Sequence, residues 1–393
     1  MQTAITSHID ELINLIREIY GEGFIPLHRP IFEGNERQYV VDCINSNFVS
    51  SVGAQVRKFE EHCEQFTGVQ HCISTVNGTS ALHVALKISG VEVGHEVITQ
   101  ALTFVATCNA ITYCGAQPIF IDVDQDTMGL SPQALEKWLT ANVEMRSGKA
   151  HNKSTGRRIS ACVPMHTFGH PLRIREVVEL CARFNITVIE DAAEALGSYL
   201  GKQHVGGFGT LATLSFNGNK VITTGGGGMI LTNSQFLADR AKHLTTTAKV
   251  PHDYEFVHDE VGFNYRLPAI NAALGCAQME MLQQLLDKKL NIAKKYRSFC
   301  LKHSISFFEG MKGTSPNFWL NVVLANSRNE RNNLLNYMNS KGIMARPIWC
   351  LMNSLEMYKH CQTDDLRNAK WLEDRVINIP SSAITGSIAK KAK

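Results

Sequence analysis

One lysine, Lys220, lies between an apolar run and four consecutive glycines in the stretch 215–228. The run 211–216 predicts a buried strand, and residues 229–231 predict the strand that returns beside it. Burial penalises the ammonium form of lysine, so a lysine in such a turn can serve as a nucleophile that forms a Schiff base with an aldehyde. The glycines would let a flat ring lie close to the backbone. Taken alone, the stretch favours a solvated lysine in a flexible glycine loop. A Walker-type phosphate loop is excluded, because Val221 stands where Ser or Thr is required.

The composition is that of a soluble globular protein. The 393 residues, 44% hydrophobic and 19% charged, predict two domains or one large one. A net charge of +3 gives no electrostatic reason to expect nucleic acid or a membrane as partner. Eleven cysteines without a CxxC pair predict reduced thiols, and no signal peptide or membrane span is recognisable. We therefore expect a cytoplasmic protein.

The chain alternates predicted strands with predicted helices, which is typical of an open α/β sheet. The strands are expected at 71–76, 96–99, 118–123, 159–165 and 186–190. Before them, an amphipathic helix capped by Ser7 is expected to dock on the body of the protein. A polar segment, 143–158, is expected to be a surface insertion.

Two positions at strand ends are candidate ligand sites. Gly78 turns the strand 71–76 into a helix that begins with Thr79 and Ser80, and free amides at a helix start favour a phosphate. A plain helix cap explains the same residues equally well. Asp191 follows the strand 186–190, at the sheet edge where open α/β sheets bind ligands. In isolation Asp191 could simply cap a turn.

Two patterns that suggest metal sites are rejected. Aspartates alternate through 122–126 like the start of an EF-hand loop, but Thr127 replaces the glycine that such a loop needs. His166 and His170 are four residues apart, but Pro171 argues against the helix that a histidine pair of this spacing requires. We expect no metal ion.

The helix start, Asp191 and Lys220 together fit the three needs of pyridoxal phosphate. Its phosphate needs an anion site, its aldehyde an amine, and its pyridine nitrogen a carboxylate that keeps it protonated. The lysine then moves protons between carbons as a general base.

At this point the chain resembles the DegT/DnrJ/EryC1/StrS family of nucleotide-sugar aminotransferases. The resemblance spans 25–380 and rests on motifs at 49–53, 77–82, 191–197 (Asp191-Ala192-Ala193-Glu194), 215–220 (Ser215-Phe216-Asn217-Gly218-Asn219-Lys220), 262–266 and 346–349.

The resemblance implies fold type I, the aspartate aminotransferase-like architecture. A large domain would hold a mixed, mostly parallel seven-stranded sheet between helices, followed by a smaller C-terminal α/β domain. The expected division is an N-terminal helical extension at 1–24, a cofactor-binding large domain at 25–268 and a small domain at 269–393. The family also implies a homodimer with shared active sites.

The family's residue roles carry over as expectations. Lys220 would form the Schiff base and move the proton, Asp191 would pair with the pyridine nitrogen, and Glu194 would lie beside the ring oxygen of the cofactor. The remaining cofactor contacts would be Gly78, Thr79, Ser80 and Ser215 at the phosphate, Asn264 from the other subunit, and Phe104 stacked on the ring. Substrate contacts are expected from Ser51, His166, Asn219 and Trp349.

Lys220 also favours one branch of the family, because relatives that dehydrate sugars at C3 carry histidine there. The N-terminal helix and residues 25–28 and 48–51 resemble the branch of legionaminic acid and N-acetylbacillosamine synthesis. The implied acceptor is a UDP-linked 4-keto-6-deoxy-N-acetylhexosamine, with L-glutamate as amino donor. Two alternatives remain open: a sister enzyme acting on GDP-4-keto-6-deoxymannose, and a paralogue that binds the cofactor without turnover.

Overall fold

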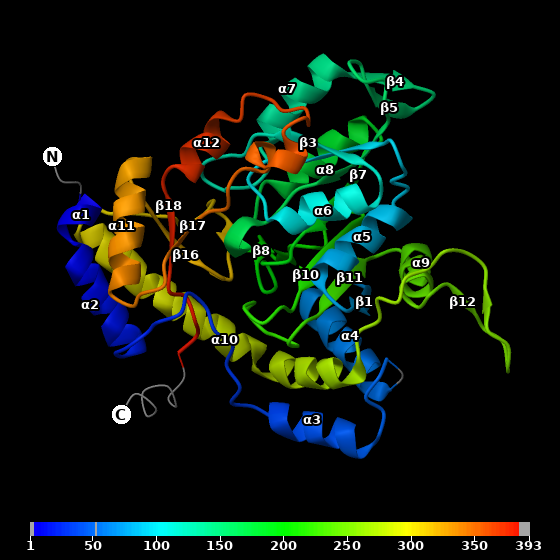
Figure 1. The fold of residues 1–393 in the computed structure, drawn as a ribbon, viewed down its shortest axis with the longest axis horizontal. Helices are drawn as coiled ribbons and strands as arrows, with labels where there is room; N and C mark the ends of the chain where they lie inside the picture. Colours follow the sequence, from blue (N-terminus) through cyan, green and yellow to red (C-terminus); the bar gives the residue numbers. More distant parts are fainter. Residues whose placement is uncertain (1–3, 52, 385–393) are drawn as a thin grey trace.

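A long helix, α10 (Ala269–Lys302), joins the two sheets around which the chain folds (Figure 1). The structure, a computed structural model, describes residues 4–51 and 53–384. The first half of α10 packs on α3 (Glu36–Asn45) and α4 (Ala54–Thr67) beside the larger sheet. Its last turns pack on the smaller sheet, so one helix sets the spacing between the two halves.

The larger sheet has seven strands and a mixed, mostly parallel pairing. In spatial order the strands are β1 (His71–Thr75), β11 (Gly228–Thr232), β10 (Leu211–Ser215), β7 (Thr187–Asp191), β6 (Ile159–Val163), β2 (Glu96–Gln100) and β3 (Gln117–Ile121). Strand β11 runs antiparallel to both neighbours, and the pairs from β10 to β3 are parallel. The predicted fold class is confirmed.

Helices cover both faces of this sheet, because successive side chains on a strand point to opposite faces. On β2, Val97 packs into a core with α5 (Gly78–Ile88), α6 (Val105–Tyr113) and α9 (Gln235–Thr245). The next residue, Ile98, packs into a second core with α7 (Pro132–Asn142) and α8 (Ile174–Arg183). Strands buried on both faces explain the nearly continuous apolar runs of the sequence.

The smaller half forms around a four-stranded sheet. Its strands, in spatial order, are β14 (Ser306–Phe307), β16 (Asn321–Leu324), β18 (Val376–Ile379) and β17 (Arg346–Pro347). Helices α1 (Ala4–Ser7), α2 (Ile9–Tyr20) and α11 (Arg328–Ser340) share its core with the end of α10. The N-terminal helix therefore docks as expected, but its predicted cap is wrong: α2 begins after His8, and no side chain caps it.

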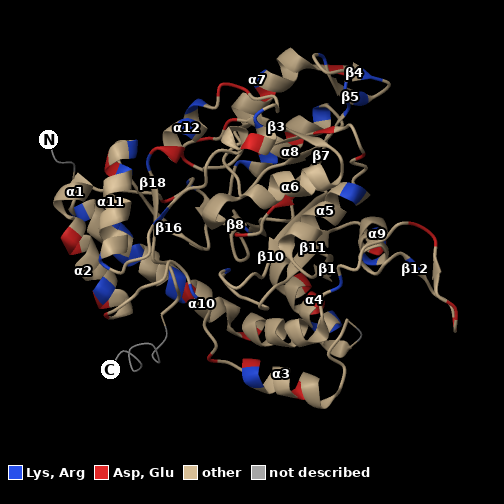
Figure 2. Ribbon diagram, in the orientation of Figure 1, with Lys and Arg blue, Asp and Glu red and all other residues tan. Residues whose placement is uncertain are grey.

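The remaining elements are short. They are β4 (Val143–Arg146), β5 (Lys149–Asn152), β8 (Tyr199–Leu200), β9 (Gln203–His204), β12 (Lys249–Val250), β13 (Val257–His258), β15 (Thr314–Ser315), α12 (Arg367–Glu373) and the 3-10 turns Thr167–Gly169, Met352–Ser354 and Glu356–Tyr358. The hairpin β4–β5 is the expected polar insertion. Charges of both signs interleave over the helices visible in Figure 2. No helix in the described part of the chain is long and apolar enough to cross a membrane.

Asp122, the first of the three alternating aspartates, joins the end of β3 to α12. Its carboxylate accepts hydrogen bonds of 2.8 Å from the amides of Asn368 and Ala369 in the first turn of α12. It is a helix cap supplied from a distant part of the chain, and it is buried. Asp124 instead pairs with Arg173 at 2.7 Å, nearer the surface.

We predict that Asp122→Ala lowers the free energy of unfolding by about 2–3 kcal/mol, because one buried amide and one partly buried amide lose a charged acceptor. Asp124→Ala, which breaks a partly exposed ion pair, should cost less than about 1 kcal/mol. Urea denaturation followed by far-UV circular dichroism compares the two midpoints. Equal shifts for both variants would show that the capping bonds of Asp122 contribute no more than a surface ion pair.

Candidate active site

A cavity of about 320 Å³ opens at the carboxyl ends of the central strands. It is lined by Asn77, Gly78, Thr79, Leu82, Phe104, Ala106, Met165, Asp191, Ala193, Glu194, Ser215, Asn217, Asn219, Lys220, Trp319 and Trp349. Nine of the predicted site residues lie in this set: Gly78, Thr79, Phe104, Asp191, Glu194, Ser215, Asn219, Lys220 and Trp349. The structure thus brings together groups that are up to 271 positions apart in the chain, counted from Gly78 to Trp349.

Lys220 projects into this cavity from the loop between β10 and β11. Its side chain is 14% exposed, and its Nζ lies 3.2 Å from Oε1 of Glu194. The same Nζ lies 4.0 Å from the centre of the Trp319 ring, a cation–π contact. The amine is therefore enclosed, as the sequence predicts, but it is held by a carboxylate and an aromatic face rather than by desolvation alone.

The glycines after Lys220 serve a different purpose from the one expected. None of residues 225–228 lines the cavity. A Cβ at Gly228 would lie 2.4 Å from the carbonyl oxygen of Asn77, and one at Gly227 would lie 2.2 Å from Oγ1 of Thr224. Gly225 has a φ of +79°, which favours glycine. The glycines let the loop pass close to the start of α5, and the expectation that they make room for a flat ring is wrong.

Asp191 is the last residue of β7 and is buried. Its Oδ2 accepts a 2.6 Å hydrogen bond from Oγ1 of Thr107, and its Oδ1 accepts one of 3.2 Å from the amide of Ala193. Burial raises the pKa of Asp191, whereas these hydrogen bonds and the charge of Lys220 act to lower it. The carboxylate is fixed in place and can face a cationic group in the cavity.

Glu194 follows Asp191 on the turn after β7. Burial raises the pKa of its carboxyl to about 7, against the opposing effect of Lys220. Its Oε2 accepts a 2.8 Å hydrogen bond from the amide of Phe168, so the side chain is anchored at one oxygen and meets Lys220 with the other. A carboxyl that titrates near neutral pH, beside the amine, can hold or release a proton there.

The start of α5 forms the opposite end of the cavity. Asn77 caps the helix: its Oδ1 accepts a 2.8 Å hydrogen bond from the amide of Ser80. Gly78 and Thr79 line the cavity, whereas the buried Ser80 does not. A Cβ at Gly78 would lie 3.0 Å from Cβ of Ser215, so glycine lets the helix start and Ser215 meet. This end can bind a phosphate through helix amides and hydroxyls.

Three aromatic side chains, Phe104, Trp319 and Trp349, line the cavity that holds Lys220. The ring of Phe104, which is half exposed, lies 5.9 Å from that of Trp349. Trp319 donates from Nε1 to the carbonyl oxygen of Asn219 at 2.6 Å and lies over Lys220. Trp319 was not predicted as a site residue, because a lone tryptophan far from the motifs carries no positional signal.

Four predicted residues are not brought to the cavity. His166 is fully buried, and its Nε2 lies 3.0 Å from Oε2 of Glu190, so its ring contacts this buried carboxylate instead of lining the cavity. The expectation that His166 contacts substrate does not fit this position. Ser51 borders a different cavity, beside Arg57. Asn264 is exposed and accepts a 3.1 Å hydrogen bond from Arg266. The fourth is Ser80, behind the helix start.

These residues fit pyridoxal phosphate. The cavity has a helix start for the phosphate, an enclosed amine for the aldehyde and a fixed carboxylate for the pyridine nitrogen. The close contact between Gly78 and Ser215 forms a cradle that any larger side chain at 78 would fill. The donors and acceptors thus match each functional end of the cofactor.

We predict a stability effect from Glu194 between pH 4.5 and 7. The carboxyl has a higher pKa in the folded chain than in the unfolded one, so the folded state binds more protons in this interval. The free energy of unfolding should therefore fall by about 3 kcal/mol as pH rises from 4.5 to 7. Glu194→Gln should remove this fall. Urea midpoints of the cofactor-free protein and the variant at pH 5 and pH 8 test it. A pH-independent difference between the two proteins would contradict the assignment.

Comparison with known proteins supports the same reading. A model of the DegT/DnrJ/EryC1/StrS aminotransferase family matches residues 30–387. The GDP-perosamine synthase of Escherichia coli O157:H7 is 36% identical over 363 residues, 91% of this chain and 93% of that protein. EpsN of Bacillus subtilis, a putative pyridoxal phosphate-dependent aminotransferase, is 35% identical over 83% of this chain and 81% of that protein.

Solved structures share the fold. Helicobacter pylori PseC, an aminotransferase involved in the biosynthesis of pseudoaminic acid, has a TM-score of 0.83 at 24% identity, over 94% of this chain and 97% of PseC. These relatives do not single out the legionaminic acid and N-acetylbacillosamine branch expected from the N-terminal motifs; the E. coli relative bears the name of the GDP-linked alternative. The chain belongs to the DegT/DnrJ/EryC1/StrS aminotransferase family and is a pyridoxal phosphate-dependent sugar aminotransferase.

Proposed function

We propose that this enzyme moves an amino group from L-glutamate to the C4 ketone of a nucleotide-linked 4-keto-6-deoxyhexose. The observation that carries the proposal is the Lys220 amine, enclosed in one cavity with Asp191, Glu194 and the start of α5. A chain that only bound the cofactor would have no need of an amine paired with a carboxyl that titrates near neutral pH.

When bound, pyridoxal phosphate supplies an aldehyde for the amine and a ring that accepts electrons from a substrate carbon. Lys220 acts as the general base and general acid that moves the proton. Its Nζ takes the proton from Cα of glutamate in the first half of the reaction and delivers a proton to C4 of the sugar in the second. Its enclosure keeps bulk water from competing for that proton.

The two acids have separate tasks. Asp191, fixed by Thr107 and Ala193, keeps a negative charge against the pyridine nitrogen and so favours its protonated form. Glu194 orients the Lys220 amine by its hydrogen bond and can exchange a proton with it. Trp319 restricts the amine from the other side.

The acceptor sugar has two candidates. The name of the E. coli relative favours GDP-4-keto-6-deoxymannose, the substrate of a perosamine synthase-like enzyme. The resemblance of residues 25–28 and 48–51 to the N-acetylbacillosamine branch favours a UDP-linked 4-keto-6-deoxy-N-acetylhexosamine. Both sugars carry the C4 ketone that the reaction converts.

Turnover with a panel of sugars tests this proposal. We expect the purified holoenzyme, given glutamate, to convert one of the two 4-keto sugars into a product whose mass identifies a primary amine. The visible absorption of the bound cofactor should change with glutamate alone. Lys220→Ala should lower kcat by several orders of magnitude, because the group that moves the proton is gone. No product from either sugar, with an unchanged spectrum, would favour the non-catalytic alternative.

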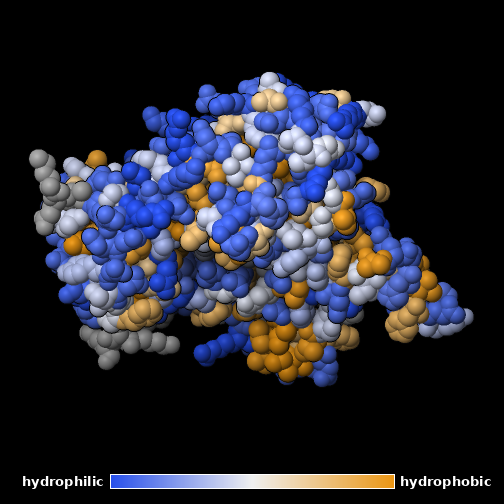
Figure 3. Space-filling view, turned by 45° about the horizontal axis from the view of Figure 1, so that its top comes forward, coloured by the Kyte–Doolittle hydropathy of each residue, from blue (hydrophilic) through white to orange (hydrophobic). Residues whose placement is uncertain are grey.

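We further propose a homodimer with shared sites. The surface of α3 and the residues after it carry the exposed apolar side chains Val41, Ile44, Phe48 and Val49, each 42–63% exposed. Figure 3 shows an orange area at its lower edge, where Figure 1 places α3. The β12–β13 arm also exposes Tyr254 and Phe256. Patches of this kind favour association with a second copy.

Asn264 lies just beyond this arm, exposed and outside the cavity of its own chain. In a dimer it can reach the phosphate end of the neighbouring site, as the family resemblance implies. Each site then needs Lys220 from one protomer and Asn264 from the other.

Mixing two inactive variants tests the shared site. Asn264→Asp puts a negative charge against the phosphate, and Lys220→Ala removes the amine; each should be inactive alone. After the two proteins are unfolded together and refolded in equal amounts, one of the two sites in each mixed dimer is intact. Activity should recover to about a quarter of the wild-type value for random pairing. Recovery should be absent if both residues act within one protomer.

The eleven cysteines are free thiols, and all but Cys350 are buried. Burial raises the pKa of most of these thiols, for example that of Cys276 to about 12, which keeps them unreactive. We propose a reducing compartment such as the cytoplasm, as the cysteine pattern of the sequence predicts.

A further inference from the structure

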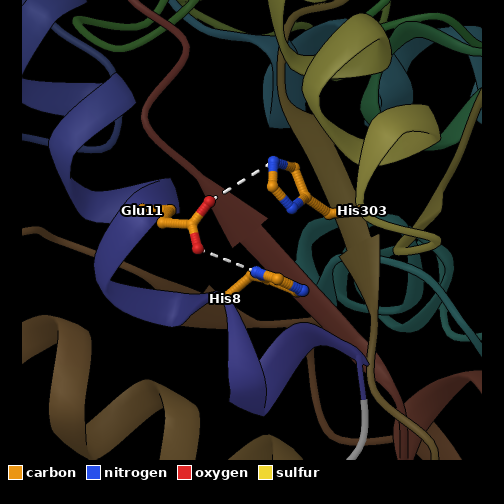
Figure 4. A group of neighbouring side chains, drawn as sticks. All are labelled: His8, Glu11 and His303. Atoms are coloured by element: carbon orange, nitrogen blue, oxygen red, sulfur yellow. Dashed lines mark hydrogen bonds and ion pairs between the residues drawn. The ribbon is translucent and has the colours of Figure 1, made fainter.

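Two histidines and a glutamate meet far from the active site, where the N-terminal helix touches the end of α10. His8 immediately precedes α2, Glu11 lies in its first turn, and His303 follows the last residue of α10. Figure 4 shows the Glu11 carboxylate between the two imidazoles. None of the three takes part in the proposed reaction.

The carboxylate faces one nitrogen of each ring. Oε1 of Glu11 lies 2.9 Å from Nδ1 of His8, and Oε2 lies 3.4 Å from Nε2 of His303. The three ligand atoms all lie within 4.8 Å of one another. Ligand atoms around a tetrahedral zinc ion are about 3.3 Å apart, so small side-chain rotations would bring these atoms to a common ion.

The backbone beneath the cluster is fixed. Leu12, Ile13 and Ile16 of α2 are buried in the core shared with the end of α10. The His303 ring is only 10% exposed and lies 4.4 Å from the ring of Phe299. Glu11 is 53% exposed, so water can complete the coordination of an ion from the solvent side.

The donor set selects the kind of ion. Two imidazoles and one carboxylate suit zinc and similar transition metals, whereas calcium and magnesium prefer oxygen ligands throughout.

A second cluster, His243, Asp259 and Glu260, makes a useful contrast. It offers only one imidazole, and Arg240 already neutralises Glu260. Nothing comparable to Arg240 is paired with Glu11, whose ion-pair partners among the described residues are the two histidines.

We propose that His8, Glu11 and His303 bind one zinc-class divalent cation, which fastens the N-terminal helix to the end of α10. The match to the family model begins at residue 30, so His8 and Glu11 precede the part of the chain that this model covers. The ion would bridge two chain segments about three hundred residues apart and restrain the N-terminal helix, adding to the apolar packing and to hydrogen bonds such as that from Tyr337 to Asp10.

The test uses untagged holoenzyme that has been dialysed against a chelator and then freed of it. Isothermal titration with zinc chloride should show about one ion bound per chain, and zinc should raise the thermal midpoint of unfolding. Glu11→Gln and His303→Gln should each weaken binding by at least about tenfold and abolish the rise in the midpoint. His243→Ala, in the contrasting cluster, should leave both unchanged. Turnover without zinc should be the same in all of these proteins.

Circular dichroism in the absence of zinc checks that the Glu11→Gln variant, which keeps the size of the side chain, is folded. The proposal is overturned if the wild-type chain takes up no zinc. It is also overturned if both variants bind zinc as tightly as the wild type, since the ion then lies elsewhere. Loss of binding in His243→Ala, with binding kept in Glu11→Gln, would assign the ion to the other cluster.

Discussion

The contact between the Lys220 amine and the Glu194 carboxyl is the interaction on which the site depends. Both groups are largely removed from water. A charged group in such surroundings is costly unless it has a partner. Together, and with the Trp319 ring against the amine, they give an amine whose position is defined and whose proton has a nearby acceptor. The loop around Lys220 and the turn after β7 must therefore be held rigidly with respect to each other.

That rigidity comes from the part of the chain that follows the long helix. Asn317 donates from Nδ2 to the carbonyl oxygens of Glu194 and Leu196, and its Oδ1 accepts from the amide of Trp319. Asn317 also packs closely against Gly169: a Cβ at Gly169 would lie 1.8 Å from Oδ1 of Asn317. Through Asn317, the segment that enters the smaller sheet places Trp319 on Lys220. The second half of the molecule thus completes a site that the first half begins.

Much of the fold and the central chemistry could be predicted because they are local in the chain. Strand and helix alternation is a property of short windows. Asp191 ends one strand and Lys220 follows another, and both strand ends had to lie at the ligand edge of the sheet. The roles of Asn77 and Thr107 were missed. Asn77, which caps α5, precedes Thr79 and Ser80, the residues predicted at the phosphate. Thr107 contacts Asp191, which is 84 positions away in the sequence.

The order of strand, anion-binding helix start, aspartate and lysine along the sequence was enough to determine a mostly parallel α/β sheet and a cofactor chemistry. This order could not determine which side chains point into the cavity, because the burial and direction of a side chain depend on neighbours that are distant in the chain. His166 turned behind the strand ends to meet Glu190, and the glycines served backbone packing. The contact of the His8 ring with the His303 ring, like that of Trp319 with Lys220, joins residues that α10 separates in the sequence, and it arises only in the folded chain.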